Sequence, residues 1–288
     1  MAKRMYFLGV STGASSIQRI FPQWVGLAGV PDVVLKGLDI AVGAPPQAYR
    51  DAAARMSEDP DCQGALVTTH KVSLYRHAHD LFDAFDDDAT LLGEVSCVVC
   101  RGRRLRGQAI DTLTAELSLR ALLRGESFAG EALILGAGGA GLALAVVLRR
   151  HHRPARVILT DVSSERLHEI RALVDAECVE VLAPSDHDRL IAPLSPGCLI
   201  VNATGVGKDR PGSPVTEAVR FPPRAVAWDL NYRGDLKLLD YARQADVEAA
   251  DGWEYFLHGW SQIMARVLEF EVTPALFERM RVAASASR

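Results

Sequence analysis

Short apolar runs alternate with longer amphipathic stretches along most of the chain. In the first half, the apolar runs predict β-strands over residues 4–10, 33–40, 64–68, 94–100 and 104–109. The stretches between them predict helices over residues 45–56, 74–85 and 112–123, and a further helix that ends near Trp24. The acidic run Asp86, Asp87 and Asp88 follows the second of these helices, and we expect it to form a solvated helix end.

The second half alternates strand and helix more strictly. Strands are predicted over residues 133–135, 157–160, 180–182, 198–202 and 225–229, with helices over residues 142–150, 164–176, 188–191 and 236–244. This alternation predicts a doubly wound parallel sheet of the Rossmann type, so the fold class is α/β. Two last helices, over residues 255–269 and 274–284, have no accompanying strand, and we expect them to return to the first half.

A glycine-rich turn joins the strand at residues 133–135 to the helix that follows it. The turn consists of Gly136, Ala137, Gly138, Gly139, Ala140 and Gly141. In a dinucleotide fingerprint, the first glycine permits a tight turn, the second admits a pyrophosphate, and the third lets helix and strand pack closely. The amino end of the helix then faces the phosphate charge. Strand, turn and helix together predict a nucleotide site, and a glycine-rich turn without a nucleotide is the alternative.

The next predicted strand ends at Asp161, about twenty residues beyond the turn, where Rossmann folds carry an acidic residue. A carboxylate at this position accepts hydrogen bonds from the ribose hydroxyls of NAD and repels the 2′-phosphate of NADP. The sequence therefore predicts NAD as the cofactor, in preference to NADP.

The amino-acid composition favours a globular protein over a nucleic-acid-binding, membrane or secreted one. The 288 residues carry a formal net charge of −4 and are 49% hydrophobic, as expected for a globular protein of two domains. The mildly acidic balance gives no support to nucleic-acid binding. We expect no membrane span and no signal peptide, because no apolar run is long enough for either. Five scattered cysteines suggest reduced thiols, which predicts a cytoplasmic protein.

The cysteines and histidines do not form a metal-binding pattern. Cys97 and Cys100 have CxxC spacing, but alternation along the predicted strand points their thiols to opposite faces, so we expect buried structural thiols. His151 and His152 are expected on a helix surface without a spaced cysteine or carboxylate partner. We therefore expect no metal site.

Lys71 and Asp111 each follow a predicted strand in the N-terminal half, where open α/β sheets bind ligands. Oxidation of an alcohol requires a group that takes the hydroxyl proton as hydride leaves carbon. A lysine can take that proton, and an aspartate can orient the hydroxyl. Taken singly, each residue is also explained as a surface charge, and Asp111 as the N-cap of the helix over residues 112–123.

The order of several short motifs resembles the shikimate/quinate dehydrogenase family over nearly the whole chain. The matching stretches are residues 9–16, 67–68 with Lys71, 92–95, 107–111, 136–141 and 202–207, Asp229 with Tyr232, and Gly252. The resemblance implies an N-terminal α/β substrate domain followed by a Rossmann-type nucleotide domain. It places the substrate domain at residues 1–111, a linking helix at 112–124, the NAD-binding domain at 125–250, and helices packing back on the substrate domain at 251–288.

The resemblance also implies roles for single residues. Lys71 and Asp111 match the catalytic lysine and aspartate of the family, and Ser15, Thr68 and Tyr232 match positions that hold the substrate. Asp161 stands where NADP-using members commonly have an Asn-Arg pair. The remaining cofactor positions are Asn202, Ala203, Thr204, Gly205 and Gly207, in the turn beside the nicotinamide ribose, and Gly252.

Other residues depart from the family pattern. Before the lysine, Leu66 replaces the asparagine of Asn-Val-Thr-x-Pro-x-Lys, the proline is absent, and the turn is one residue shorter. Ser96 replaces the asparagine of Ala-Val-Asn-Thr, and Gly259 replaces a glutamine that binds the substrate. Each buried substrate hydroxyl left without a partner costs about 1–3 kcal/mol. The catalytic pair is kept while the recognition residues change, which predicts a substrate other than shikimate.

Three polar residues are candidates to compensate for the lost amides: His70 beside the lysine, Ser96, and Gln262 one turn beyond Gly259. In the first loop, Ser16 is a possible substitute for the second of the family's paired serines, because Ile17 falls on that position. His70 is a candidate donor to a substrate carboxylate or an extra proton carrier, and it is equally well explained as a turn histidine.

We therefore expect an NAD-dependent oxidoreductase that transfers hydride between nicotinamide and a secondary hydroxyl of a small cyclic hydroxy acid. True shikimate or quinate dehydrogenation is the first alternative, and a non-catalytic NAD-binding regulator is the second. The expected partner is the small-molecule substrate, without nucleic acid or membrane, and the composition fits either a monomer or a homodimer.

Overall fold

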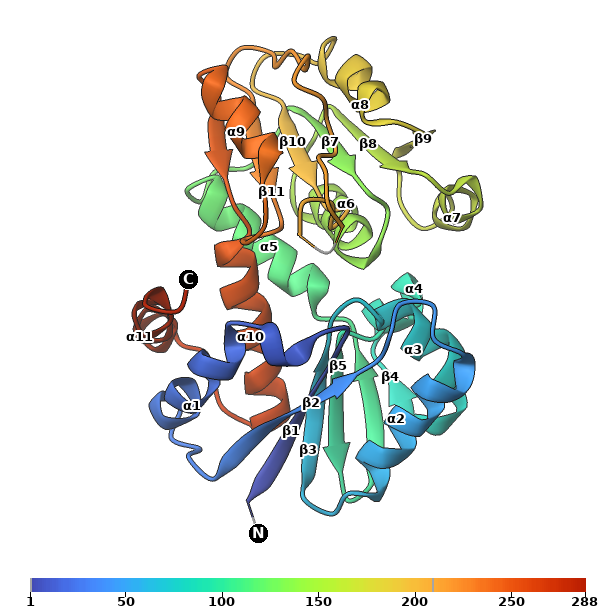
Figure 1. The fold of residues 1–288 in the computed structure, drawn as a ribbon, viewed down its shortest axis with the longest axis vertical. Helices are drawn as coiled ribbons and strands as arrows, with labels where there is room; N and C mark the ends of the chain where they lie inside the picture. Colours follow the sequence, from blue (N-terminus) through green and yellow to red (C-terminus); the bar gives the residue numbers. More distant parts are fainter. Residues whose placement is uncertain (1, 209) are drawn as a thin grey trace. The chain divides into compact units, whose positions relative to one another are not determined.

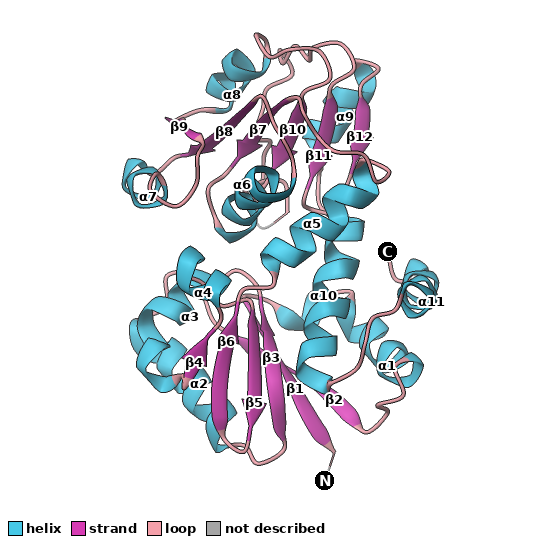
Figure 2. Cartoon of the chain, turned by 180° about the vertical axis from the view of Figure 1, so that it is seen from behind, coloured by secondary structure: helices cyan, strands magenta, loops and turns pink. Residues whose placement is uncertain are grey.

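In a computed structural model that describes residues 2–208 and 210–288, the chain folds into two compact units (Figures 1 and 2). The first unit holds the chain up to Ile110 together with Leu257–Arg288, and the second holds Asp111–Phe256. Each unit contains a six-stranded sheet with helices packed on it. The predicted α/β fold class is confirmed.

A mixed sheet forms the centre of the first unit, in the order β2-β1-β3-β5-β6-β4. Its strands are β1 (Lys3–Gly9), β2 (Val33–Asp39), β3 (Cys62–Val67), β4 (Ala84–Phe85), β5 (Cys97–Arg101) and β6 (Arg104–Gln108). β1 pairs in parallel with β2 and β3, whereas β5 runs antiparallel to β3 and β6. The carboxyl end of β3 leads directly into Thr68 and, three residues later, Lys71.

Helices cover both faces of this sheet. They are α1 (Ile17–Leu27), α2 (Pro46–Glu58), α3 (Lys71–Ala78), α4 (Asp87–Leu92), α10 (Trp253–Leu268), α11 (Pro274–Ser285) and the short 3-10 helices η1 (Thr12–Ala14) and η2 (His79–Leu81). Tyr6 and Leu8 of β1 face α2 and α3 in one core cluster. Phe7 points to the opposite face, where its ring meets Trp260 of α10 edge-on at 4.9 Å.

The second unit has a fully parallel sheet in the order β12-β11-β10-β7-β8-β9. Its strands are β7 (Glu131–Leu135), β8 (Arg156–Asp161), β9 (Glu177–Glu180), β10 (Leu199–Asn202), β11 (Val226–Asp229) and β12 (Glu248–Ala250). The chain runs outward from β7 to one edge and then from β10 to the other, which is the Rossmann order. The order reverses between β7 and β10, where such sheets bind ligands.

The sheet of the second unit is covered on both faces (Figures 1 and 2). Its helices are α5 (Asp111–Leu122), α6 (Gly139–His151), α7 (Ser164–Ile170), α8 (Pro184–Ile191) and α9 (Lys237–Gln244). Ile191 of α8 and Leu238 of α9 join Leu133 and Ile200 in one core cluster, while α6 packs with α5 on the other face. Burial on both faces explains the continuous apolar run of β7.

Several predicted segments end differently in the structure. The helix predicted over residues 74–85 ends early, and Ala84–Phe85 pair with β6 as strand β4. The acidic run opens a helix instead of closing one, because the Asp86 carboxylate accepts a hydrogen bond from Ala89 N at 2.7 Å and caps α4. Helix α7 ends at Ile170, and the strand β12 was not predicted. In the part of the chain that the structure describes, no helix is long and apolar enough to cross a membrane.

The turn between β7 and α6 leaves no space for a side chain at Gly141. A Cβ atom there would lie 1.9 Å from the carbonyl oxygen of Gly136, because α6 begins directly against the turn. Gly136 itself has a φ of +101°, which favours glycine. At Gly138, a Cβ atom would meet no atom within 4 Å, and the φ of −68° suits any residue. The first and last glycines therefore shape the turn, while Gly138 keeps the space beside it open.

We expect Gly141→Ala to lower the free energy of unfolding by about 2–4 kcal/mol, because the new methyl group overlaps a backbone oxygen that cannot move away. Gly138→Ala is the matched control and should change that free energy by less than about 1 kcal/mol. Urea unfolding followed by circular dichroism measures both. Equal stability of the two variants would contradict the close approach at Gly141.

Candidate active site

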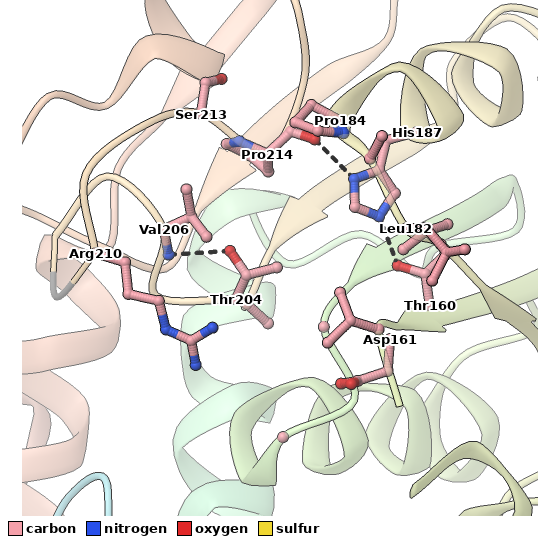
Figure 3. Close-up of a pocket in the computed structure, with 16 residues that line it drawn as sticks. Thr160, Asp161, Leu182, Pro184, His187, Thr204, Val206, Arg210, Ser213 and Pro214 are labelled. Atoms are coloured by element: carbon pink, nitrogen blue, oxygen red, sulfur yellow. Dashed lines mark hydrogen bonds between the residues drawn. The ribbon is translucent and has the colours of Figure 1, made fainter. Parts of the chain in front are cut away.

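A cavity of about 310 Å³ lies within the second unit, at the carboxyl ends of its central strands (Figure 3). Gly136 and Gly138 line it after β7, and Thr160 and Asp161 at the end of β8. The segment after β10 supplies the opposite side, with Ala203, Thr204, Val206 and Arg210. The structure thus brings the glycine-rich turn, Asp161 and the segment at residues 202–207 around one cavity at the switch point of the sheet.

The Asp161 carboxylate is fixed by two backbone groups. Its Oδ2 accepts a hydrogen bond from Ala137 N at 2.9 Å, and its Oδ1 accepts one from Ser163 N at 3.0 Å. Each oxygen of an ionised carboxylate can accept more than one hydrogen bond, so both retain acceptor capacity toward the cavity. The carboxylate is therefore held in place while it is able to bind hydroxyl groups.

Ala137 is held on both sides of the glycine-rich turn. Its N–H donates to Asp161, and its carbonyl oxygen accepts a hydrogen bond from Arg166 Nε at 3.0 Å. These two contacts hold the turn to β8 and α7, which keeps the amino end of α6 beside the cavity. Backbone N–H groups at a helix amino end favour an anion.

The segment after β10 is stabilised by its own side chains. Asn202 Oδ1 accepts hydrogen bonds from the backbone N of Thr204 at 3.1 Å and from its hydroxyl at 2.7 Å. Asn202 Nδ2 donates to Asp229 Oδ2 at 2.9 Å, and Thr204 Oγ1 accepts from Val206 N at 3.0 Å. This network gives the turn at residues 202–207 a defined shape against the end of β11.

In the first unit, backbone contacts bring Lys71 and Ser96 close together. Lys71 is the first residue of α3 and is half-buried, and its carbonyl oxygen accepts a hydrogen bond from Val95 N at 3.1 Å. Ser96 is fully buried next to Val95, and its hydroxyl oxygen accepts from Ile110 N at 2.7 Å. Asp111, the first residue of the second unit, follows Ile110 directly and begins α5. Thr68 precedes Lys71 by one turn, and its hydroxyl donates to Leu8 O at 3.2 Å.

Comparison with known proteins gives the family. No family model matches the chain. A shikimate dehydrogenase (NADP(+)) from Symbiobacterium thermophilum is 33% identical over 204 residues, which is 68% of this chain and 67% of the relative. The chain belongs to the shikimate dehydrogenase family. The shikimate dehydrogenase (NADP(+)) of Streptococcus thermophilus is 30% identical over 183 residues, and the match spans 62% of that relative's length.

Solved structures from the family share the fold along the whole chain. The shikimate 5-dehydrogenase of Thermus thermophilus, in complex with NADP(H) and shikimate, matches with a TM-score of 0.74 at 24% identity, over 99% of this chain and 100% of that one. The quinate dehydrogenase of Corynebacterium glutamicum, in complex with NAD, matches with a TM-score of 0.75 at 22% identity, over 98% of both chains. At these identities the likeness establishes the fold.

Two candidate replacements for the amides of the family pattern are already engaged by the protein. His70 is 3% exposed; its Nε2 lies 2.7 Å from Ile40 O, and its Nδ1 lies 3.3 Å from the Tyr49 hydroxyl. Ser96 is committed to Ile110 N. Both side chains therefore stabilise the first unit, and in this conformation neither ring nitrogen of His70 is available to a ligand.

The other predicted substrate residues divide between the two units. Ser15 is buried, and Ser16 stands before α1 without a side-chain cap; Gln262 is half-buried on α10. All three belong to the first unit. In the second unit, the Tyr232 ring packs on Phe256 at 4.6 Å. Gly252 is required by the backbone, because a Cβ there would lie 1.9 Å from Leu230 O.

Some polar residues were missed or misplaced by the sequence prediction. The buried His187 and the exposed Arg210, which both line the cavity, carry no pattern that predicts their positions. His152 is buried and not on a helix surface, because its Nδ1 accepts a hydrogen bond from Phe128 N at 3.0 Å. Cys97 and Cys100 are buried free thiols, as expected. Among residues 2–208 and 210–288, no three His, Cys, Asp or Glu side chains are grouped to hold a metal ion.

Asp229, beneath the turn at residues 202–207, makes the stability of the second unit depend on pH. Burial raises the pKa of Asp229 from 3.8 to about 6, although hydrogen bonds from Asn202 and Asn231 lower it. Because the folded-state pKa lies above the unfolded one, the folded state holds an extra proton between these values. The stability that this group contributes therefore falls as the pH rises through that window.

We expect the free energy of unfolding of the wild type, relative to Asp229→Asn, to fall by about 3 kcal/mol between about pH 3 and 7. The asparagine variant supplies the reference because it does not titrate. Urea unfolding at a series of pH values measures the difference. A difference that stays constant over this range would show that Asp229 is ionised throughout.

Proposed function

We propose that this chain is a nicotinamide-dependent oxidoreductase of the shikimate/quinate dehydrogenase type. It transfers hydride between the cofactor and a secondary hydroxyl of a small cyclic hydroxy acid. The observation that carries the proposal is the cavity of the second unit, where the glycine-rich turn and the fixed Asp161 carboxylate meet. Membership of the family supports the same activity.

The residues around the cavity fit a dinucleotide. The open space beside Gly138 allows a pyrophosphate to approach the backbone at the amino end of α6. Asp161 lies at the end of β8 with acceptor capacity for the ribose hydroxyls. The segment at residues 202–207 borders the opposite side, where the nicotinamide ribose belongs by analogy with the family. When bound, the nicotinamide accepts or supplies the hydride.

The preference for NAD over NADP rests on the charge at position 161. A 2′-phosphate would come close to the Asp161 carboxylate, which two backbone N–H groups hold in place. The two negative charges would repel each other. The ribose 2′-hydroxyl of NAD, in contrast, donates a hydrogen bond to an oxygen of the Asp161 carboxylate. Both cofactors occur among the relatives. The shikimate dehydrogenases are named for NADP, and the quinate dehydrogenase structure is a complex with NAD.

Lys71 takes the hydroxyl proton in this proposal, and Asp111 orients the hydroxyl. Lys71 is half-buried and begins α3. The neutral amine of a lysine can accept the proton of an alcohol as hydride leaves carbon. Asp111 follows the segment that Ser96 holds through Ile110 N, so its backbone position is fixed. Thr68, whose hydroxyl lies at the end of β3, is the third polar residue of the proposed substrate site, with Lys71 and Asp111.

The substrate differs from shikimate in this proposal because two of the candidate replacements, His70 and Ser96, do not supply the amides that bind shikimate in the family. Leu66 and Gly259 bring no amide group. His70 and Ser96 are bound to Ile40, Tyr49 and Ile110, so their polar atoms compensate for no lost contact. Two or three unpaired substrate hydroxyls, at about 1–3 kcal/mol each, would weaken shikimate binding by orders of magnitude. A cyclic acid with fewer or rearranged hydroxyls fits this side better.

The experiment that tests the function is NAD reduction by the purified protein with shikimate, quinate and a panel of cyclic hydroxy acids. We expect turnover of a panel compound, and Lys71→Ala should lower kcat by at least about 100-fold while NAD still binds. Lys36→Ala, an exposed lysine of the same unit, is the control. Efficient turnover of shikimate or quinate would refute the altered substrate. Binding of NAD without any turnover would indicate a regulator.

The cofactor preference is tested with Asp161→Asn. Removing the negative charge should improve NADP relative to NAD by about tenfold or more, which corresponds to about 1.4 kcal/mol of lost repulsion. Asp175→Asn changes an exposed carboxylate of the same unit and should leave the ratio unchanged. The ratio of kcat/KM for the two cofactors is the measurement. An unaltered ratio in Asp161→Asn would assign the discrimination to another group.

A further inference from the structure

His187 of α8 is the side chain that joins the two sides of the nucleotide cavity. It lines the cavity, is 6% exposed, and hydrogen-bonds to both sides (Figure 3). Its Nε2 lies 2.9 Å from the hydroxyl of Thr160, next to Asp161 on β8. Its Nδ1 lies 2.7 Å from the carbonyl oxygen of Pro214, in the segment that follows β10. One imidazole ring therefore bonds both to the end of β8 and to the segment at Pro214.

The partners of His187 define its protonation. A carbonyl oxygen only accepts, so Nδ1 carries the hydrogen that is donated to Pro214. In the neutral ring, Nε2 is then an acceptor for the Thr160 hydroxyl. Burial lowers the pKa of His187, although the Pro214 carbonyl and the neighbouring carboxylates of Asp186 and Asp188 act in the opposite direction. Both hydrogen bonds are consistent with the neutral ring.

The segment that His187 holds is also fixed at its other end. Asn202 Nδ2 and Asn231 Nδ2 donate to Val206 O at 3.3 and 3.2 Å, and Gly207 N donates to Arg210 O at 2.8 Å. Arg210 thus stands between two anchors, the amides at Val206 and the imidazole at Pro214. These contacts place the backbone of Arg210 at the cavity.

Arg210 is the cation of this cavity. Among the described residues that line it, Arg210 is the one with a positively charged side chain, and Asp161 is the one with a negative charge. The Arg210 side chain is exposed, and within residues 2–208 and 210–288 its guanidinium group makes no hydrogen bond or ion pair. It lines the same cavity as Gly138, which precedes α6, so it is suited to a phosphate in that cavity, which a guanidinium group can bind with two hydrogen bonds.

We propose that Arg210 binds a phosphate of the nucleotide and that His187 is the positioning residue that holds Arg210's side of the cavity. The proposal rests on the proposed function, because it takes the cavity as a nucleotide site. Pyrophosphate and 2′-phosphate present the same chemistry to Arg210. If it binds the pyrophosphate, it serves NAD and NADP equally; if it binds the 2′-phosphate, it offsets part of the repulsion from Asp161.

The role of Arg210 is tested by calorimetric titration of Arg210→Gln with NAD, NADP, ADP and adenosine. We expect about tenfold weaker binding of the phosphate-bearing ligand and unchanged binding of adenosine. Losses for NAD and ADP assign the pyrophosphate, and a loss confined to NADP assigns the 2′-phosphate. Arg224→Gln, an exposed arginine further along the chain, is the control. Wild-type affinity of Arg210→Gln for NAD, NADP and ADP overturns the proposal.

The role of His187 is tested with a pair of variants. His187→Leu removes both hydrogen bonds and should raise the Kd and the KM for NAD about tenfold, with a smaller fall in kcat. His187→Asn should recover part of the affinity, because its amide nitrogen can replace Nδ1 as the donor to Pro214. His152→Leu, at a similarly buried histidine of the same unit, should lower the Tm without changing the Kd.

The outcomes separate this proposal from the function on which it rests. If His187→Leu does not fold, Thr160→Val removes one of the two hydrogen bonds and should weaken NAD binding by a smaller factor. NAD affinity of wild-type strength in folded His187→Leu and in Thr160→Val overturns the positioning role. A wild-type protein that binds neither NAD, NADP nor ADP contradicts the proposed function itself.

Discussion

The hydrogen bond from Ala137 N–H to the Asp161 carboxylate is the contact on which the cavity of the second unit depends. It joins the turn after β7 to the end of the neighbouring strand β8, and as a charge-assisted bond it is stronger than a neutral one. The close approach of Gly141 to Gly136 O then places α6 directly behind the turn. One carboxylate thus both shapes the turn and lines the cavity, so a substitution at this position also acts on the geometry of the turn.

The parts of the fold that sequence could predict are those fixed by backbone geometry or by burial on both faces. The glycine-rich turn and Asp161 have a spacing that the Rossmann connection imposes, and the buried run of β7 identifies its strand. The segment at Asp86 is different, because three acidic residues close one helix as readily as they open the next. The structure opens α4 there since Ala89 N–H is available to Asp86. α4 has six residues, too few for a helical period to be visible.

The sequence could predict which residue types belong to the candidate site. It could not predict which of their polar atoms are free to bind a ligand. The position of Lys71 after β3 follows from the pattern, whereas the commitment of Ser96 to Ile110 N depends on how β5 and the end of β6 meet. The sequence around His70, His152 and His187 does not indicate which partner each side chain has. Each is buried in the structure, and each stabilises a different pair of segments through its ring nitrogens. Long-range partners decide these roles, and no local pattern contains them.

The order of the chain within the two units has a consequence for biosynthesis. The second unit is one continuous stretch, whereas the first is completed by Leu257–Arg288, which the ribosome makes after the whole of the second unit. Until then, Phe7 lacks the ring of Trp260, and the Trp24 indole lacks its acceptor, Met280 O at 2.9 Å. The apolar faces of β1 and α1 therefore stay exposed to water until helices α10 and α11 have been synthesised. The second unit, by contrast, can assemble its sheet before then. During synthesis, exposed apolar surface makes the first unit more prone to aggregation than the second. A chaperone that binds nascent chains would therefore act on the first unit.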